Sequence, residues 1–438
     1  MEYSPRKSTI ILLLLLLLPS FFVISDTTMT LERIQLSTPS QTINWLEGWE
    51  YRKSHSITGS VGAGIGYQMR VIVHRFAGLD SGEDVYVGTN CQSDFGDIRF
   101  TDGDGTTLLD YWLEEATVVR ATFWVEVNDN LDTDQTIYIY YSAFSAKTSL
   151  SSGYNTFPLF DDFNRADTDL VDGGWFDDSG DGDNDIENNV LKTVQNENEF
   201  CHIEMPAPSH SNFVLHGKLR QHAIAPASWK MAVGAYWGSD RWIKVGWRSN
   251  DNFEANLFSD SNTDNGALPY LGLDDTWCYY KIEVGTNAID YYYSLDGEMW
   301  TLIHSANRLA GVTGSPLLII IGKGYENPNT LYPNLDWDNN YATAGPEYTN
   351  YADDIFLRKF VDVEPVHEDW GAETIFDEVT QPTTGPGTPG EPLDIDLAMI
   401  TVFAAGGVAG IALVLGLVTI ARTGREVVAP SQPSGYEW

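Results

Sequence analysis

Apolar and polar residues alternate with a period of two along much of the chain between residues 49 and 362, and this pattern constrains the fold most strongly. In the segment YQMRVIV, from Tyr67 to Val73, every odd position is apolar, and similar segments recur between Gly, Asn and Asp breaks. Such alternation is typical of strands that bury one face, whereas an amphipathic helix repeats every three to four residues. An Asp-Gly pair in SLDGEMW, from Ser294 to Trp300, indicates a β-hairpin. We therefore expect an all-β chain that forms β-sandwiches.

The composition excludes several classes of protein. The 438 residues carry a formal charge of −37, so the bulk of the chain repels phosphate backbones and anionic lipid surfaces, and we predict no nucleic-acid partner. Aromatic residues make up 13% of the sequence, which is too many for a disordered protein. The three cysteines are too few for a disulfide scaffold.

The N-terminus has the parts of a secretory signal. Arg6 and Lys7 precede an apolar run that ends at Leu18, and the small residue Ser25 stands at the break before Asp26. We predict a signal peptide over residues 1–25, cleaved after Ser25, with an uncleaved anchor as the alternative. Residues 26–48 then form an N-terminal extension.

A second apolar run begins at Leu397, ends at Ile420 and contains no charged residue. As a helix it is about 36 Å long, enough to cross a bilayer core of about 30 Å. Arg422 and Arg425 follow it, so residues 421–438 are predicted to be a cytoplasmic tail. The chain is thus expected to be a single-pass type I membrane protein with an extracellular bulk.

Two glycines within this run, Gly406 and Gly410, have the small-xxx-small spacing of helix-packing faces. A homodimer through this face is one interpretation. The other is that glycine is simply common in membrane helices.

The extracellular part divides at two changes of composition. A Ser/Ala/Gly-rich stretch near residues 142–156 separates a first β-sandwich domain, residues 49–150, from a second, residues 157–362. Residues 363–395 are acidic and then rich in Pro, Gly and Thr, which predicts a stalk that holds the domains away from the membrane.

Several motifs of the first domain resemble domain of unknown function 2341, which occurs in archaeal and bacterial surface proteins. They occur in the expected order, and the resemblance covers residues 49–163; the motifs are WEYRK at 49–53, DFGDIRFTDGDGTTLLDYWLE at 94–114, FWVEV at 123–127 and IYIYY at 137–141. In that family a concanavalin-like, laminin-G-like jelly roll commonly follows, and the second domain resembles one. The resemblance implies a binding or adhesive module at a cell surface, here an archaeal one.

An acidic segment after Trp175 has oxygen-bearing residues at alternate positions, as calcium loops do. Its twelfth position is Asn188 where a calcium loop has a bidentate Glu, so a solvated acidic turn is the alternative. The predicted calcium ligands are Asp177, Ser179, Asp181, Asp183 and Asp185.

A second cation site is predicted where the first and last strands of the second domain pair. This pairing brings Asp162 near Asp353, and the two like charges call for a cation or a basic partner. Arg165 and Arg358 are the candidate partners in the alternative without an ion.

Aromatic side chains suggest a carbohydrate platform, because sugar rings stack on flat aromatic faces. Trp237 and Trp247 are in phase with the apolar residues of their strands and are predicted to lie in the core. The candidate ligand-binding residues are out of phase with the core, and they are Trp229, Trp242, Tyr279 and Tyr292.

No His-Glu-x-x-His, Gly-x-Ser-x-Gly or phosphate-binding loop occurs in the sequence, so we predict that the chain is not an enzyme. The leading hypothesis is a surface protein that binds an extracellular glycan or a surface protein. The alternatives are a structural envelope component that assembles laterally and, third, a glycoside hydrolase.

Overall fold

The computed structural model describes part of the chain, and all of that part belongs to one unit, Met1–Pro382. The described residues are 44–178, 183–195, 201–222, 231–238, 241–248, 252–260, 262–268, 273, 275–323 and 348–376. The predicted signal peptide, membrane helix with Gly406 and Gly410, and cytoplasmic tail lie outside them. Among the described residues, no helix has the length and apolar composition needed to cross a bilayer.

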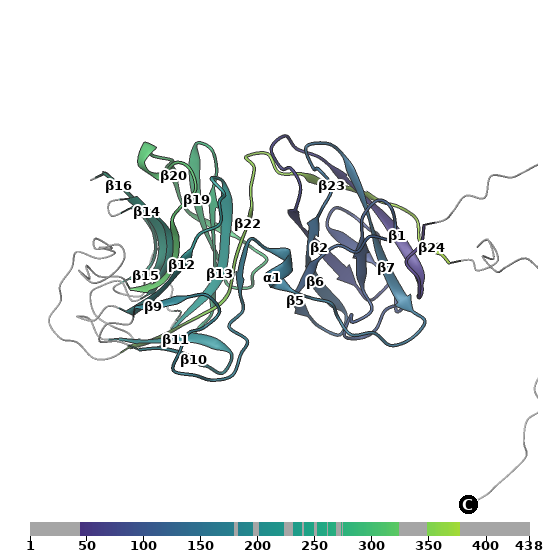
Figure 1. Ribbon diagram of the computed structural model, residues 1–438, viewed down its shortest axis with the longest axis horizontal. Helices are drawn as coiled ribbons and strands as arrows, with labels where there is room; N and C mark the ends of the chain where they lie inside the picture. Colours follow the sequence, from purple (N-terminus) through teal and green to yellow (C-terminus); the bar gives the residue numbers. More distant parts are fainter. Residues whose placement is uncertain are drawn as a thin grey trace, which may run out of the picture. The chain divides into compact units, whose positions relative to one another are not determined.

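The described residues form two β-sandwiches (Figure 1), which confirms the prediction of an all-β fold. In the first sandwich, a five-stranded sheet consists of β23 (Val366–Trp370), β1 (Trp49–Thr58), β7 (Gln135–Ala143) and β4 (Arg99–Thr101), with β24 (Thr374–Ile375) also paired to β1. The facing sheet consists of β3 (Asp84–Tyr86), β2 (Tyr67–His74), β6 (Arg120–Val127) and β5 (Tyr111–Ala116). Side chains from both sheets share one apolar core.

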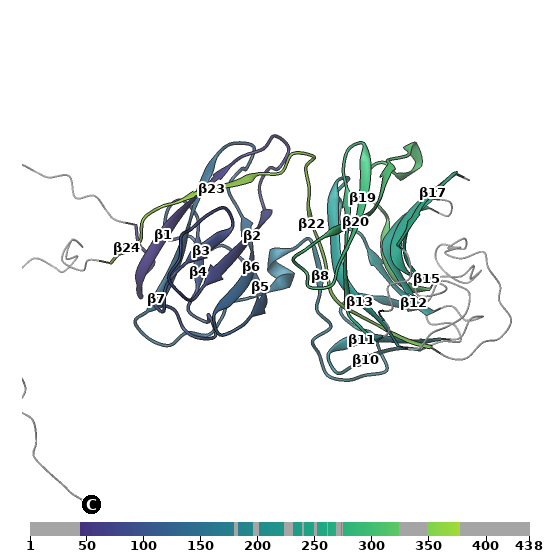
Figure 2. The ribbon, with the colours of Figure 1, turned by 180° about the vertical axis from the view of Figure 1, so that it is seen from behind.

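The second sandwich has larger sheets. One runs in the order β10 (Asp183–Glu187), β11 (Val190–Gln195), β22 (Tyr348–Lys359), β13 (Phe213–His222), β18 (Cys278–Val284), β19 (Ala288–Ser294) and β20 (Thr301–Asn307), with β8 (Leu159–Asp161) also paired to β22. The other runs β17 (Asn262–Ala267), β16 (Asn252–Ser259), β15 (Arg241–Arg248), β14 (Met231–Gly238), β21 (Leu318–Lys323), β12 (Cys201–Pro206) and β9 (Phe176–Asp178). Figure 2 shows both sheets from behind. The concanavalin-like character of this sandwich stays a prediction.

Strand β18 shows how the alternation in the sequence builds this core. Cys278, Tyr280 and Ile282 are fully buried between the two sheets, while Tyr279 and Lys281 on the opposite face are half-buried. The predicted hairpin also forms, because β19 ends at Ser294, β20 begins at Thr301, and the Asp-Gly turn lies between them.

The segment 364–375, which we call the strap, differs from the prediction of a stalk beginning at residue 363. It leaves the second sandwich after β22 and returns to the first, where β23 and β24 pair with β1 (Figure 1). Trp370 explains the difference: its ring packs against the first core and its Nε1 donates to the Gly82 carbonyl at 2.9 Å. The second sandwich is therefore inserted between two parts of the first.

A short linker with helix α1 (Gly153–Thr156) joins the sandwiches. Ser152 caps this helix, since its hydroxyl accepts from the Asn155 amide. A 3₁₀ turn, η2 (Ala310–Val312), follows β20.

Candidate functional site

The two sandwiches contact each other through the outer faces of two sheets. On β2, Tyr67 and Met69 point into the first core, while Gln68 and Arg70 point out of it. Gln68 is 2% exposed because it donates to the Thr156 carbonyl at 2.9 Å and accepts from the Lys359 amide at 3.0 Å. Both faces of β2 are thus covered. The face that carries Gln68 and Arg70 lies in the junction between the sandwiches.

Aromatic rings fill the centre of the junction. Trp112 of β5 and Trp124 of β6 meet Phe356 of β22 with ring centroids 5.5 Å and 5.6 Å apart. Phe157, just after α1, and Phe160 of β8 complete this aromatic cluster. All five rings are buried, so water is excluded here.

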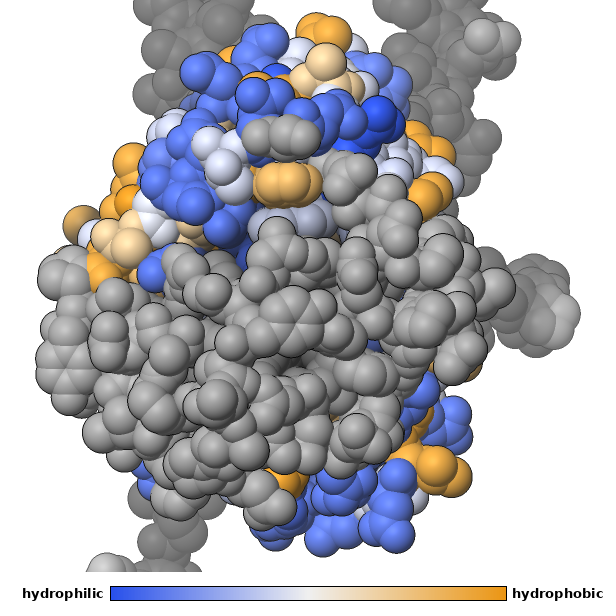
Figure 3. Space-filling model, turned by 90° about the vertical axis from the view of Figure 1, so that its left-hand side faces the viewer, coloured by the Kyte–Doolittle hydropathy of each residue, from blue (hydrophilic) through white to orange (hydrophobic). Residues whose placement is uncertain are grey.

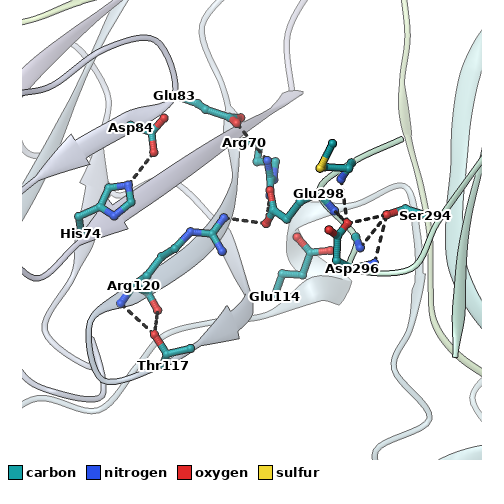
Figure 4. Close-up of polar contacts among 12 residues, drawn as sticks. Arg70, His74, Glu83, Asp84, Glu114, Thr117, Arg120, Ser294, Asp296 and Glu298 are labelled. Carbon is teal, nitrogen blue, oxygen red and sulfur yellow. Dashed lines mark hydrogen bonds and ion pairs between the residues drawn. The ribbon is translucent and has the colours of Figure 1, made fainter. Parts of the chain in front are cut away.

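Ion pairs lie at the edge of the same junction. The carboxylate of Glu298, in the β19–β20 hairpin, forms ion pairs with two guanidinium groups of the first sandwich (Figure 4). The distances are 2.7 Å to Arg70 and 2.6 Å to Arg120. Arg70 also binds Glu83 at 3.0 Å. The hairpin tip is therefore held to the first sandwich by charge-assisted hydrogen bonds.

A pocket of about 250 Å³, the inter-sandwich pocket, opens between these contacts. Trp124 and Trp300 supply aromatic rings, and Arg70, Lys281 and Glu114 are among its charged lining groups. Trp300 is half-buried, and the Lys281 ammonium lies 5.1 Å from its ring centroid. The pocket combines flat apolar surface with fixed hydrogen-bonding groups, as small-molecule sites do.

Two carboxyl groups of the pocket have pKa values shifted in opposite directions. Burial raises the pKa of Glu114 to about 7, although Arg70 and the indole of Trp124 oppose the shift. Burial acts in the same direction on Glu364, but its ion pair with Arg358 outweighs burial and lowers its pKa. At neutral pH Glu114 is thus partly protonated and Glu364 is ionised.

His216 of β13 also lines the pocket and is 7% exposed. Its ring stacks on Phe356 at 4.5 Å. Burial and the nearby Arg358 and Lys281 lower its pKa well below the ordinary range, so it is neutral. A neutral imidazole here offers one donor and one acceptor.

The structure brings together the residues of the second predicted cation site. Strand β8 pairs with β22, and Asp162 and Asp353 line a pocket of about 260 Å³ with Glu114 and Asp354. The basic partner is not one of the two predicted, because Lys218 binds Asp353 at 3.0 Å and Asp354 at 2.6 Å. Arg165 pairs with Asp161 at 2.8 Å instead, and Arg358 pairs with Glu364.

The three predicted calcium ligands that the structure describes lie on two different sheets. Asp177 is on β9 and accepts from Asn184 at 2.7 Å, whereas Asp183 and Asp185 are on β10. Ser179 and Asp181 lie outside the described residues. Within the described part of the chain, no three His, Cys, Asp or Glu side chains converge as metal ligands. The calcium loop stays a prediction.

The predicted aromatic platform is divided between two sheets. Trp242 of β15 lies on the outer face of the seven-stranded sheet, 6% exposed and stacked on Phe258 at 5.3 Å. Tyr279 and Tyr292 are on the other sheet, in β18 and β19. Trp229 lies outside the described residues. The surface of this side that Figure 3 describes is mostly hydrophilic, with scattered hydrophobic groups.

The predicted core tryptophans can also be placed. Trp247 is fully buried in the second core, as predicted, and Trp237 is half-buried and packs against it. Sequence reasoning missed Trp124 and Trp300, the two tryptophans that line the pocket. A signal for Trp124 exists, because it lies out of phase with Phe123 and Val125, which indicates a strand covered on both faces.

A family model described as "Domain of unknown function (DUF2341)" matches residues 94–177. The resemblance to that family is therefore confirmed for this part of the chain, which runs from just before β4 into β9. A search of curated proteins gave no match.

Solved structures show only low similarity. A GH43 protein, BlXynB, from Bacillus licheniformis has a TM-score of 0.33 and 13% identity over 58% of this chain and 50% of its own. A laminarinase from Flavobacterium sp. UMI-01 has a TM-score of 0.32 and 11% identity, over 46% of this chain and 99% of its own. An uncharacterised protein from Mycobacterium paratuberculosis has a TM-score of 0.35 and 11% identity over 45% and 99%. This chain spans half the length of the Bacillus protein, and no functional conclusion follows from these similarities.

Proposed function

We propose that this chain is a membrane-anchored cell-surface protein that binds a neutral glycan in the inter-sandwich pocket. The observation that carries the proposal is the pairing of Trp124 and Trp300 with hydrogen-bonding groups in one pocket of about 250 Å³. This volume is just below the ~300 Å³ at which ordinary small-molecule sites begin, so it suits a ligand about the size of one sugar residue. The anchor rests on the uncharged run 397–420 in the sequence alone.

The charges around the pocket favour an uncharged ligand. Arg70 is bound by Glu83 and Glu298, and Lys281 by Glu283 at 2.8 Å. Since these cations already have anionic partners, a charged ligand would have to break an ion pair to bind. Sugar hydroxyls both donate and accept, so they match a lining that offers both kinds of group.

The test is binding of the full chain, purified in detergent, to an array of neutral and acidic oligosaccharides, followed by calorimetric titration of the best binder. We expect Trp300→Ala to weaken binding at least about tenfold, because a tryptophan that acts as a binding hot spot contributes about 2 kcal/mol or more and each 1.4 kcal/mol is tenfold in affinity. Trp277→Ala is the matched control, since Trp277 is also half-buried but lies against Lys218 and Arg220 outside the pocket. Binding to acidic glycans alone, or equal binding by Trp300→Ala and wild type, would contradict the proposal.

Hydrolysis of the bound glycan is a second candidate function, and the opposite pKa shifts of Glu114 and Glu364 favour it. A proton donor and an ionised carboxylate are what glycoside hydrolysis requires. Chromatography of the bound oligosaccharide after prolonged incubation tests this function. Release of a shorter sugar by wild type but not by Glu114→Gln would support it, and an intact ligand would exclude it.

A further inference from the structure

The strap forms part of the wall of the inter-sandwich pocket. Glu364 and His367 line the pocket, and Glu364 accepts from the Tyr67 hydroxyl at 2.8 Å as well as from Arg358. Beyond these residues, β23 and β24 hold the strap to β1 at the edge of the first sandwich. Detachment of the strap would therefore remove one side of the pocket.

Two histidines join the strap to β1. The ladder shifts register between His55 and Ile57, and the Nε2 atom of His55 lies 2.8 Å from the Nδ1 atom of His367. His55 is fully buried, and its ring stacks on Trp370 with a centroid separation of 3.9 Å. A hydrogen bond between two imidazoles needs one donor and one acceptor, so at least one ring must be neutral.

We propose that the strap is an acid-released wall of the inter-sandwich pocket, and that protonation of both His55 and His367 detaches it from β1. The release of a glycan by this movement rests on the proposed function, whereas the detachment does not. Two imidazolium rings would place like charges in contact in a buried site and would leave the hydrogen bond with two donors.

The surroundings of the pair keep both rings neutral while the strap is attached. Burial and the neighbouring ring lower the pKa of His55 to about 3, with the backbone of Asp369 acting in the opposite direction. Burial and Arg70 lower the pKa of His367 to about 4, and Asp84 and Glu364 oppose them.

The sign of the pH effect follows from these shifts. A detached strap returns both histidines to a pKa near 6.5, so below pH 6.5 the detached form binds protons that the attached form does not. Each pH unit between about 6.5 and 4 then favours detachment about tenfold per histidine, or about a hundredfold for the pair. The ion pair with Arg358 lowers the pKa of the strap carboxylate Glu364, so protonation of Glu364 does not account for a loss of protection between pH 6.5 and pH 5.

Hydrogen–deuterium exchange of the full chain, corrected for the chemical rate at each pH, tests detachment without any ligand. We expect the protection of residues 366–375, measured relative to β6, to fall at least about a hundredfold between pH 6.5 and pH 5. In His55→Asn/His367→Gln this fall should disappear above pH 4.5. His304→Asn is the matched control, because His304 pairs with Asp264 at 2.7 Å in the second sandwich, away from the strap, and should leave the fall unchanged.

Unchanged protection of the wild-type strap at pH 5, or an equal fall in the double histidine variant, would overturn the proposal. If the double histidine variant does not fold, a second variant tests the same proposal. Thr58 pairs with Val366, so oxidised Thr58→Cys/Val366→Cys would fix the strap to β1. This variant should keep full protection at pH 5, and loss of protection despite the crosslink would equally contradict acid detachment. These exchange measurements need no glycan, so failure to find a bound glycan would contradict the proposed function and not the detachment of the strap.

Discussion

Two buried tyrosines on neighbouring strands differ in one hydrogen bond. Tyr280 and Tyr291 are both fully buried in the second core. The Tyr291 hydroxyl donates to the Asn256 carbonyl at 3.2 Å, whereas the Tyr280 hydroxyl has no partner among the described residues. A buried hydroxyl without a partner costs about 1–3 kcal/mol.

We therefore expect Tyr280→Phe to raise the free energy of unfolding by about 1 kcal/mol, because it removes a hydroxyl that has lost water and gained no partner. Tyr291→Phe should lower it by about the same amount, since it removes a made hydrogen bond. Urea denaturation of the two variants at neutral pH measures both changes. A loss of stability in Tyr280→Phe as large as that in Tyr291→Phe would show that Tyr280 has a partner in solution.

At the scale of elements, the β19–β20 hairpin is predictable from sequence because its turn is local. The Asp296 carboxylate accepts from the amides of Glu298 at 2.9 Å and Met299 at 2.8 Å, so a few adjacent residues determine the turn. The amides of Met299 and Glu298 lower the pKa of Asp296 to about 2. The support that Asp296 gives is thus complete above about pH 4 and is lost only as the pH falls toward 2, below the range in which the strap is expected to detach.

The strap is the opposite case. Its pairing with β1 joins residues such as Val366 and Thr58, which are distant in sequence, and its run of acidic residues is typical of a spacer. The inter-sandwich pocket was not predicted from the sequence, because its residues come from both sandwiches and the strap and are likewise distant in sequence. Alternation shows which face of a strand is apolar, but it does not show which polar face another sheet will cover.

Asp296→Ala should loosen the hairpin tip that carries Glu298 and Trp300. We expect hydrogen exchange of residues 297–300 to rise at least about tenfold and glycan binding to weaken several-fold. Asp104→Ala is the control, because Asp104 supports a turn of the first sandwich in the same way, accepting from the Thr106 and Thr107 amides. If both variants weaken binding equally, the effect comes from general instability and not from the hairpin tip.

At the scale of the whole described structure, insertion of one sandwich into the other makes their stabilities interdependent. Two chain connections cross the junction, one before β8 and one after β22. Gln68, the aromatic cluster and Glu298 join the facing sheets between them. We expect the two sandwiches to unfold together as long as this junction is intact.

Trp124→Ala should separate the two unfolding events. Trp124 contributes its ring to the aromatic cluster and not to either core, and truncation of a buried tryptophan costs about 3–5 kcal/mol. Scanning calorimetry of the wild-type chain should show one transition, and the variant should show two. Phe123→Ala is the control on the same strand, since Phe123 faces the first core; it should lower the melting temperature but keep one transition. A single transition in Trp124→Ala, with equal calorimetric and van't Hoff enthalpies, would mean that the chain connections and polar contacts alone couple the sandwiches, and that the aromatic cluster serves mainly to exclude water from the pocket.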